Sequence, residues 1–363
     1  MKALLRLLAN AAGLGWVAWL SRSTSPTGAR VFVELRDPAL AKDLAVVLLA
    51  LSRQNLKLRV RLSPRLLAGF TALGRQLLLA SCPWPWWPWQ TPPTKGRVFT
   101  DCPQRARRQG WQLLCPEALV PSGWTVRRLQ VGLHPSLLAN EQTLLAARPT
   151  KVMTRLARVF FSGNTDPQVY ANAAMASHYG VPTRLQIIEA LLSPSWCGPP
   201  PVVLRTAEDL EDFLQGAFAD ALVVAQWRWS PQASSGLDCR IPNERWLEVL
   251  ASVDYFLACP GIRTLDCHNL AEALAMGATP ILPASPHWHG VLESGRNALL
   301  FSDLAELPAV MVRAIDGPSP DRRGAITTYQ QHFSLRAMAE TLMDPDLPVQ
   351  TAISLYQEVY VPY

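Results

Sequence analysis

Hydrophobic and polar positions between residues 30 and 80 alternate between patterns typical of strands and patterns typical of helices. Arg30–Leu35 (RVFVEL) is a short apolar run that predicts a buried strand. Asp37-Pro38 then opens a helix, since aspartate caps a helix start and proline fits its first turn. Residues 56–62 alternate apolar with basic side chains, which predicts a strand with one basic face, and residues 65–80 have a helical pattern. This β-α-β-α order is typical of a parallel sheet covered by helices.

A run of tryptophans and prolines, Pro83–Trp89 (PWPWWPW), interrupts this alternation. Its prolines exclude a regular helix or a central strand. Two interpretations remain open: a rigid loop packed on the first domain, or a contact with a membrane interface or a lipid acceptor, where tryptophan is favoured. Beyond this run, short apolar stretches predict further strands of the same half at Val98–Thr100, Trp111–Leu114 and Val126–Gly132.

The second half of the chain repeats the α/β alternation after a boundary near residues 145–155. Strands are predicted at Arg158–Phe161, Val202–Leu204, Leu222–Gln226, Tyr255–Ala258, Thr279–Leu282 and Ala298–Phe301, with helices at 166–179, 184–192, 243–252 and 269–276. Thr206-Ala207-Glu208-Asp209 has the pattern of a helix capping box. The predicted fold class is therefore α/β, with two Rossmann-like domains that we expect to face each other across a cleft.

This pattern divides the chain into segments. We expect an apolar N-terminal helix over residues 1–24, a first domain over 25–150, a second over 151–330, and a segment with helical pattern over 331–363. The apolar stretch at the N-terminus is shorter than the about 20 residues that cross a bilayer. It is interpreted as a helix packed on the domain or lying on a membrane, with a marginal signal anchor as the alternative.

Composition narrows the class of protein. The chain has 363 residues, of which 49% are hydrophobic and 17% charged, which suffices for two domains and argues against extensive disorder. The net charge of +6 suits phosphate-bearing ligands or an anionic membrane, and no motif typical of nucleic-acid binding accompanies it. The 7 cysteines include no CxxC pair, which argues against a disulfide framework or a four-cysteine zinc site and favours a reducing, cytoplasmic location.

The stretch from Asp254 to Phe301 has the pattern of strand, loop, helix, glycine and strand, which forms one right-handed crossover unit. Ligands of such sheets bind beyond the carboxyl ends of the strands. Cys259-Pro260-Gly261 lies at such an end, and its glycine allows the backbone to approach a ligand closely. The helix that begins near Cys267 presents free N–H groups, which suit a phosphate group.

Three polar residues of this helix, His268, Asn269 and Glu272, share one face because of their spacing. A carboxylate one turn inside the helix can accept hydrogen bonds from ribose or sugar hydroxyls. The plainer interpretations are that Glu272 is an ordinary exposed helix residue and that His268 only satisfies the helix end.

The run HNLAEALAMGATPIL contains an E-A-x-x-x-G-x-x-P-[VI] block formed by Glu272, Ala273, Gly277, Pro280 and Ile281. Further blocks lie upstream, at Phe160–Asn164 with Tyr170, and downstream, at 295–307. In their order and spacing these blocks resemble the donor-binding domain of GT-B glycosyltransferases, as found in exostosin-like and related families. The resemblance covers roughly residues 155–315, and the N-terminal half matches no motif.

The resemblance implies that the chain transfers a sugar from a nucleotide-sugar donor to a saccharide or glycolipid acceptor. It implies that the second domain binds the donor and the first binds the acceptor, and that the C-terminal segment crosses back to pack on the first domain. In this fold no metal or other cofactor is generally required, because helix dipoles and basic side chains stabilise the leaving diphosphate.

The resemblance also implies roles for single residues. Glu272 matches the glutamate that holds the donor's ribose or sugar, and Gly163 and Asn164 match the loop near its diphosphate. The residues expected around the start of the helix are Cys259, Pro260, Gly261, His268 and Asn269.

Two positions depart from the family pattern. Thr264 stands where retaining members with an E-x7-E motif have a second glutamate, so neither retention nor inversion is assigned. Asn269 stands where exostosin-like families often have an arginine, and we hypothesise that Arg263 supplies the missing positive charge to the departing diphosphate.

Three further histidines are candidates for chemistry. His134 follows a predicted strand of the first domain and is either an acceptor-side general base or a turn residue. His287 and His289 suggest either a metal site or a loop with aromatic packing, and the lack of a third ligand nearby favours the loop.

Two other functions stay open. One is a catalytically silent nucleotide- or sugar-binding protein on the same fold. The other is a membrane-associated scaffold that uses residues 1–22 and Trp84–Trp89. Peripheral membrane contact through these same segments is also compatible with an enzyme.

Overall fold

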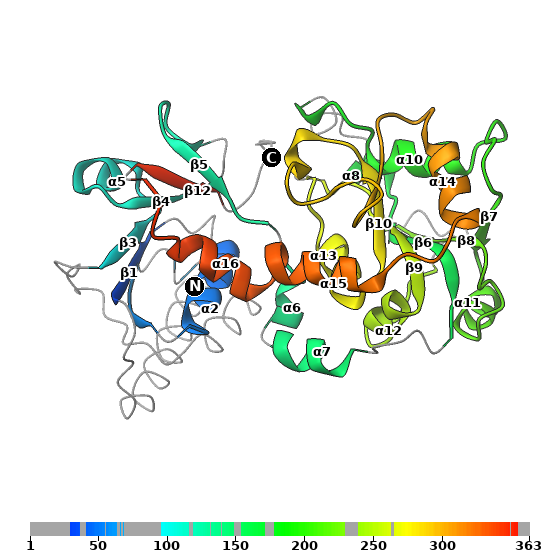
Figure 1. Ribbon diagram of the computed structural model, residues 1–363, viewed down its shortest axis with the longest axis horizontal. Coiled ribbons are helices and arrows are strands. Elements are labelled where there is room, and N and C mark those ends of the chain that lie inside the picture. The colour runs from blue at the N-terminus through cyan, green and yellow to red at the C-terminus, as the bar shows by residue number, and fades with distance from the viewer. Residues whose placement is uncertain are drawn as a thin grey trace. The chain divides into compact units, whose positions relative to one another are not determined.

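The structure is a computed structural model, and the residues that it describes form two compact units. Unit 1 comprises the described residues up to 141 together with 333–354, and unit 2 comprises those within 142–332. Residues 1–24 and the Trp84–Trp89 segment lie outside the described residues. The described residues are 30–36, 41–54, 56–63, 66, 68, 96–115, 119–130, 132–138, 140–148, 154–170, 178–228, 239–262, 265–348 and 350–354 (Figure 1).

Unit 1 is built on a six-stranded sheet with the strand order β2-β1-β3-β4-β12-β5, in which every ladder is parallel. Its strands are β1 (Arg30–Leu35), β2 (Lys57–Leu62), β3 (Arg97–Thr100), β4 (Gln112–Cys115), β5 (Thr125–Arg128) and β12 (Thr351–Ser354). Its helices are α2 (Ala41–Ser52), α5 (Pro103–Gln109), α6 (Pro135–Leu138) and α16 (Leu335–Met343), and α7 (Glu141–Ala147) follows at the boundary between the units.

Strand β12 comes from the C-terminal segment, for which the sequence pattern predicts only helix. The segment forms helix α16, which packs on α2, and after it a short strand that was not predicted. This strand lies between β4 and β5, where Ala352 pairs with Leu113 and Ile353 pairs with Arg127. Four residues carry no periodicity that would separate a strand from a helix, and their pairing partners lie far away in the sequence.

Unit 2 is built on a second six-stranded sheet, again with only parallel ladders, in the order β11-β10-β9-β6-β8-β7. Its strands are β6 (Ala157–Asn164), β7 (Pro201–Leu204), β8 (Leu222–Trp227), β9 (Val253–Leu257), β10 (Thr279–Pro283) and β11 (Leu299–Phe301). Its helices are α8 (Pro167–Tyr170), α10 (Arg184–Leu191), α11 (Ala207–Leu214), α12 (Trp246–Ala251), α13 (His268–Met276), α14 (Leu307–Asp316) and α15 (Arg322–Thr328).

Both units are therefore Rossmann-like α/β domains, which confirms the fold class predicted from the sequence. Unit 2 has its topological switch point at β6 and β9 (Figure 1). The chain leaves β6 toward β7 and β8 on one side, and it leaves β9 toward β10 and β11 on the other. Ligands of open parallel sheets bind beyond the carboxyl ends of the strands at such a point.

The amino ends of β6 and β9 are held together by arginines that pair with a carboxylate or donate to carbonyl oxygens of the fold. Arg158 is 4% exposed, pairs with Asp254 and donates from Nε to the Ala314 carbonyl oxygen at 2.8 Å. Arg322 donates to the carbonyl oxygens of Val253 at 3.1 Å and Ala251 at 2.7 Å. These guanidinium groups satisfy buried acceptors within the fold, so this edge of the sheet has the character of a structural core.

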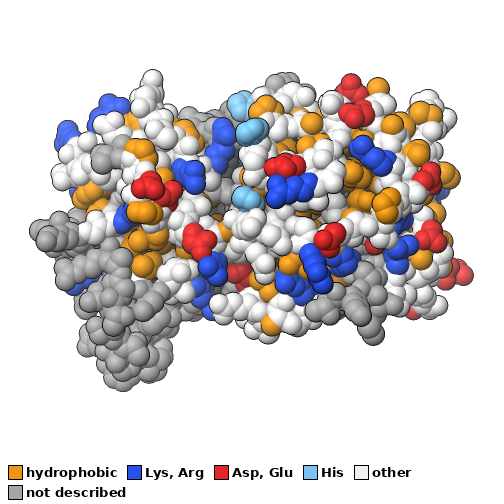
Figure 2. All heavy atoms as spheres, viewed as in Figure 1, with side chains coloured by type: hydrophobic (Ala, Val, Ile, Leu, Met, Phe, Trp, Pro, Cys, Tyr) orange, Lys and Arg blue, Asp and Glu red, His pale blue; other side chains and the backbone are white. Residues whose placement is uncertain are grey.

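Among the described residues, no helix is both long and apolar enough to cross a membrane. On the face of the molecule shown in Figure 2, basic and acidic side chains are interspersed, and neither sign of charge dominates it. The excess of positive charge is therefore not gathered into one large patch on that face.

Candidate functional site

The carboxyl end of β6 lies at the switch point of unit 2, and all 8 residues of this strand are buried. The sequence pattern predicts a strand ending at Phe161, but Gly163 and Asn164 continue it because they pair with Gln226 and Trp227 of β8. A Cβ atom on Gly163 would lie 3.0 Å from Cζ of Phe161 and 3.3 Å from Nη1 of Arg184. Glycine at this position therefore lets the Arg184 guanidinium lie directly against the strand end.

Asn164 is 3% exposed and shapes the turn that follows β6. Its Oδ1 accepts a hydrogen bond from the backbone N–H of Asp166 at 2.9 Å. Its Nδ2 is buried and has no hydrogen-bond partner among the described residues. A buried amide N–H group without an acceptor costs free energy, and a ligand oxygen at this point would remove that cost.

Arg184 is the central charged group of the site, and it was not among the residues singled out from the sequence. It is the first residue of α10, and the whole residue is 6% exposed. Nη1 donates to the Tyr170 hydroxyl at 2.7 Å and lies 3.4 Å from the Asn164 carbonyl oxygen. Nη2 lies 3.6 Å from Sγ of Cys267, and the guanidinium carbon is 4.4 Å from the centroid of the Tyr170 ring.

None of these partners of Arg184 is a carboxylate. Burial raises the pKa of the Tyr170 hydroxyl, so this partner is neutral at physiological pH. Nε of Arg184 is also buried without a hydrogen-bond partner among the described residues. A buried guanidinium without an anionic partner is costly, in contrast to Arg158 at the opposite edge, which is paired with Asp254. The site thus holds a positive charge that an anionic ligand would neutralise.

The loop after β9 carries the second part of the predicted site. Cys259 and Pro260 are buried, and Gly261 is partly exposed. Burial raises the pKa of the Cys259 thiol to about 12, so this thiol is neutral and packs as a small apolar group. Arg263, the sequence-based candidate for a cation, lies outside the described residues, as does Thr264.

Helix α13 begins beside this loop. Its N-cap residue, Cys267, has an extended backbone, and the side chain of Cys267 itself makes no capping hydrogen bond. His268 and Asn269 are partly exposed in the first turn, and Nδ2 of Asn269 lies 3.5 Å from the Ser162 carbonyl oxygen of β6. The positive end of the α13 dipole therefore lies beside the strand end that carries Gly163 and Asn164, and Cys267 brings it into contact with Arg184.

Glu272 lies deeper in α13 and is 2% exposed, which excludes the interpretation that it is an ordinary exposed helix glutamate. Its Oε2 accepts a hydrogen bond from Nε1 of Trp246 in α12 at 2.6 Å. The carboxylate is thus fixed by a partly buried donor from the neighbouring helix, on which α13 packs. Helix α13 ends at Gly277, whose φ of 87° is the left-handed conformation that glycine favours.

His287 has a partner that the sequence did not reveal. Its Nε2 bonds to Oδ1 of Asp266, and both side chains are 5% exposed. Its ring packs edge-on against Trp288, with the ring centroids 4.4 Å apart. These contacts of His287 fit the interpretation of this segment as a loop with aromatic packing. His289 is exposed, and the described residues contain no group of three or more His, Cys, Asp or Glu side chains arranged to hold a metal ion.

His134 lies in unit 1, directly before α6. Its Nδ1 is 2.7 Å from Oγ of Ser136 and accepts from the Ser136 backbone N–H at 3.3 Å. Its carbonyl oxygen accepts from the backbone N–H groups of Leu137 and Leu138. These contacts are those of a residue that starts a helical turn, as the turn interpretation expects.

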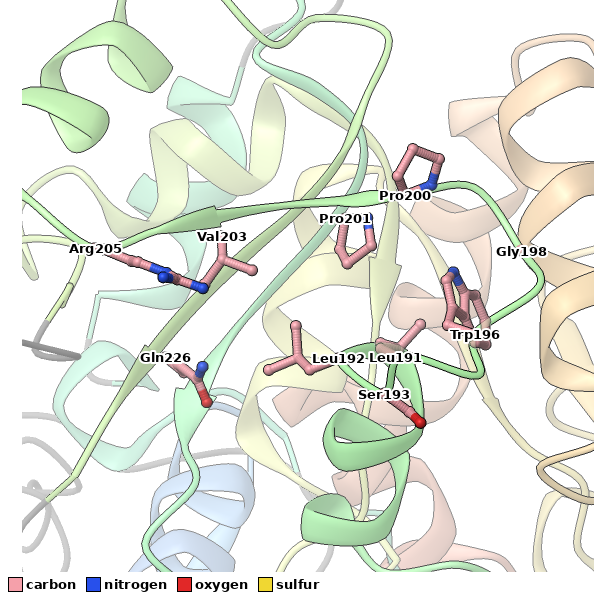
Figure 3. A pocket seen from close by; sticks show the side chains of 10 residues that line it. All are labelled: Leu191, Leu192, Ser193, Trp196, Gly198, Pro200, Pro201, Val203, Arg205 and Gln226. Carbon is pink, nitrogen blue, oxygen red and sulfur yellow. The ribbon is translucent and has the colours of Figure 1, made fainter.

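A pocket of about 380 Å³ lies beside the strand end, between α10 and the edge strands of the sheet. Figure 3 shows Arg205 and Gln226 at one end of it and Trp196 at the other. Gln226 accepts a hydrogen bond from Oγ1 of Thr165 at 3.0 Å and pairs in register with Gly163. Its lining combines apolar side chains, such as Leu191 and Val203, with the polar side chains of Arg205 and Gln226.

No family model matches the chain, and no curated protein matches it at a significant level. Three solved structures that it resembles share little sequence with it. Anabaena Alr3699/HepE, solved with UDP and glucose, has 10% identity and a TM-score of 0.42, covering 87% of this chain and 99% of its own. AviGT4, a glycosyltransferase involved in avilamycin A biosynthesis, has 12% identity and a TM-score of 0.36 over 87% of this chain and 96% of its own.

The third structure is WaaG, a glycosyltransferase involved in lipopolysaccharide biosynthesis, with 13% identity and a TM-score of 0.29 over 88% of this chain and 97% of its own. With TM-scores this low, the chemistry of the site has to be inferred from the residues of this chain.

Proposed function

We propose that unit 2 binds a nucleoside diphosphate sugar and that the protein is a glycosyltransferase. The observation that carries this proposal is Arg184, a buried guanidinium without a carboxylate partner among the described residues, at the switch point of a parallel sheet. Diphosphate is the ligand group that best fits it, because the positive end of the α13 dipole and the Arg184 guanidinium both favour one anion at this point.

The other predicted residues have roles around this diphosphate. Gly163 lets the ligand and Arg184 approach the strand end, and the free Nδ2 of Asn164 donates to a phosphate or sugar oxygen. Glu272 accepts hydrogen bonds from the ribose or sugar hydroxyls, as the family resemblance implies, and Trp246 fixes its carboxylate. Cys259, Pro260 and Gly261 form the close wall of the site.

In the proposed reaction, the oxygen of an acceptor hydroxyl bonds to the anomeric carbon while the bond from that carbon to the nucleoside diphosphate breaks. The hydroxyl proton passes to the departing diphosphate or to water. Arg184 and the positive end of α13 stabilise the negative charge that grows on the leaving group. The proposed reaction requires no cofactor, since these groups supply the positive charge. We propose that the acceptor is a saccharide or a glycolipid that binds to unit 1, and that the protein acts in the cytoplasm.

The direct test is nucleotide binding by the Arg184→Gln variant. Hydrogen bonds to charged groups contribute about 1.5–3 kcal/mol each, so we expect the Kd for UDP or GDP to rise at least about tenfold. Isothermal titration calorimetry measures this change. The matched control is Arg245→Gln, which removes an exposed guanidinium of the same unit that pairs with the exposed Glu248.

Turnover separates an enzyme from a silent binding protein. Wild-type protein mixed with a panel of nucleotide sugars should release the nucleotide slowly into water and faster with a suitable saccharide. Binding without any release would favour the silent binding protein. Equal affinity of wild type, Arg184→Gln and Arg245→Gln for every nucleotide would contradict the proposed site.

A further inference from the structure

Unit 1 contains a second concentration of positive charge, around Glu34 in strand β1, the second strand from one edge of its sheet. Nη2 of Arg36 donates to Oε1 of Glu34 at 2.9 Å, and Nη1 of Arg105 lies 2.9 Å from Oε1 and 2.8 Å from Oε2. Nη1 of Arg61 approaches Oε1 to 3.4 Å. We call Glu34 and these three arginines the Glu34 cluster.

The Glu34 cluster holds more positive charge than the buried carboxylate needs. Arg105 alone contacts both oxygens of Glu34 and neutralises its charge. No other carboxylate among the described residues lies within ion-pairing distance of the three arginines. Asp101 is nearby, but its Oδ2 accepts from the backbone N–H of Arg36 at 2.5 Å. Even with Asp101 included, three guanidinium groups face two carboxylates in the part of unit 1 that the structure describes.

The arginines are accessible, whereas the glutamate that holds them is not. The side chain of Glu34 is 2% exposed, and those of Arg36, Arg61 and Arg105 are 41%, 33% and 39% exposed. Each guanidinium has five N–H donors, and the contacts with Glu34 use only a few of them. The buried carboxylate therefore orients the three side chains, and their remaining donors stay open to a ligand.

The position of the Glu34 cluster in the sheet is that of a binding site. In the parallel register Glu34 pairs with Arg61 of β2 and with Thr100 of β3, so the cluster lies toward the carboxyl ends of three neighbouring strands. Arg105 comes from α5, which directly follows β3 (Figure 1). Ligands of parallel sheets bind at this edge, whereas the buried pair of Arg158 and Asp254 lies at the amino edge of its own sheet.

We propose that the Glu34 cluster binds an anionic group, a phosphate or a carboxylate, carried by the saccharide acceptor. That this saccharide is the acceptor rests on the proposed glycosyltransferase function, whereas the binding of a charged sugar by the cluster does not. Arginine is the side chain best suited to both groups, because its fork of donors matches their oxygen pairs. A neutral sugar would leave the surplus charge of Arg36 and Arg61 uncompensated.

The test compares three probes that share a sugar ring and differ in the group at C6: glucose, glucose 6-phosphate and glucuronate. Calorimetry or ligand-observed NMR should show that wild-type protein binds at least one charged probe more tightly than glucose. The relative affinity of the two charged probes separates phosphate from carboxylate as the natural group. The Arg61→Gln variant should weaken that binding about fivefold to tenfold, because one charge-assisted contact is lost.

The matched control is Arg59→Gln. Arg59 lies on the same strand and the same face as Arg61, but it is exposed, pairs in register with Phe32 and is not in ion-pairing contact with Glu34. Its variant should bind the charged probes within about twofold of wild type, since only weak long-range attraction changes. Equal thermal unfolding midpoints of the two variants would show that both are folded.

Two outcomes would overturn the inference. One is equal affinity for charged and neutral probes in the wild-type protein. The other is charged-sugar binding that Arg184→Gln abolishes and Arg61→Gln leaves intact, because the probes would then occupy the site in unit 2. Conversely, loss of charged-sugar binding in Arg61→Gln with unchanged nucleotide binding in Arg184→Gln would support the Glu34 cluster while contradicting the proposed donor site.

Discussion

At the scale of single residues, the candidate site depends on a missing side chain as much as on those present. Gly163 leaves the space in which Arg184 lies, since an added Cβ would lie 3.3 Å from its Nη1 and 3.0 Å from the Phe161 ring. Contacts this short force the neighbours to move. The orientation of the guanidinium is therefore set by a residue that carries no functional group of its own.

We expect Gly163→Ala to weaken UDP or GDP binding, because the new methyl group displaces either Arg184 or Phe161. The control is Gly324→Ala in α15, where the nearest atom to the new Cβ, the Arg296 carbonyl oxygen, is 3.5 Å away. This second substitution should leave binding unchanged and stabilise the fold by up to about 1 kcal/mol, since alanine favours a helix over glycine. Calorimetry and thermal unfolding of both variants check the pair, and unchanged binding by Gly163→Ala would contradict the role of this space.

The sequence indicates part of the site but not its charge. Gly163, Asn164 and Glu272 follow from the family resemblance, and the strand-loop-helix pattern places Cys259–Gly261 at a strand end. Arg184 does not stand out, because nothing in the local pattern around it separates a buried arginine from an exposed one. Its importance comes from contacts with Tyr170 and Cys267, which lie in other elements.

At the scale of elements, two helices of unit 2, α10 and α11, begin with a capping box. The N-cap side chains of Thr183 and Thr206 each accept a hydrogen bond from the backbone N–H group three residues later. The side chains at those later positions, Gln186 and Asp209, accept a hydrogen bond from the backbone N–H group of the N-cap residue. The sequence pattern T-x-x-D predicts the box at Thr206, and the structure confirms it. The equivalent T-x-x-Q at Thr183 is the one that positions Arg184, the first residue of its helix.

These two capping boxes provide a matched pair of variants. Thr183→Ala and Thr206→Ala should each destabilise unit 2 by about 1 kcal/mol, because each removes one capping hydrogen bond. Only Thr183→Ala should also weaken nucleotide binding, since only α10 carries Arg184. Denaturant unfolding and calorimetry measure the two effects separately. Equal nucleotide affinity in both variants would show that the start of α10 does not position the guanidinium.

The predicted strands and helices show what local pattern can establish. Strands β1 and β8 and helix α13 lie within a residue or two of their predicted ranges, because each has a clear apolar run or a clear start. Strand β6 is longer than predicted, because pairing with β8 holds a glycine and an asparagine in the ladder. Such pairing depends on residues far along the chain, which a local pattern does not contain.

At the scale of the whole molecule, the main departure from the sequence-based prediction is β12. Ala352 and Ile353 are fully buried, and the strand lies between β4 and β5 rather than at an edge of the sheet. Unit 1 is thus assembled from two stretches of chain that are separated by the whole of unit 2.

Ile353→Ala should therefore destabilise unit 1 by about 2–5 kcal/mol, the usual cost of truncating a buried isoleucine. The control is Val126→Ala in the neighbouring strand β5, where the side chain is 36% exposed and the expected loss is below about 0.5 kcal/mol. Nucleotide binding by unit 2 should persist in Ile353→Ala at a temperature below its unfolding transition. Denaturant unfolding followed by calorimetry checks both statements, and equal stability of the two variants would contradict them.

The insertion of β12 between β4 and β5 also orders events during synthesis. The described residues of unit 2 all lie within 142–332, so this part of the unit can fold as soon as residue 332 has left the ribosome. Unit 1 begins earlier in the chain, but its sheet has a gap until residues 351–354 emerge. The nascent chain therefore carries an unfinished first domain, with the facing edges of β4 and β5 unpaired, while the second domain is already complete. Those open edges are the part of the molecule most exposed to incorrect strand pairing or to chaperone capture at that stage.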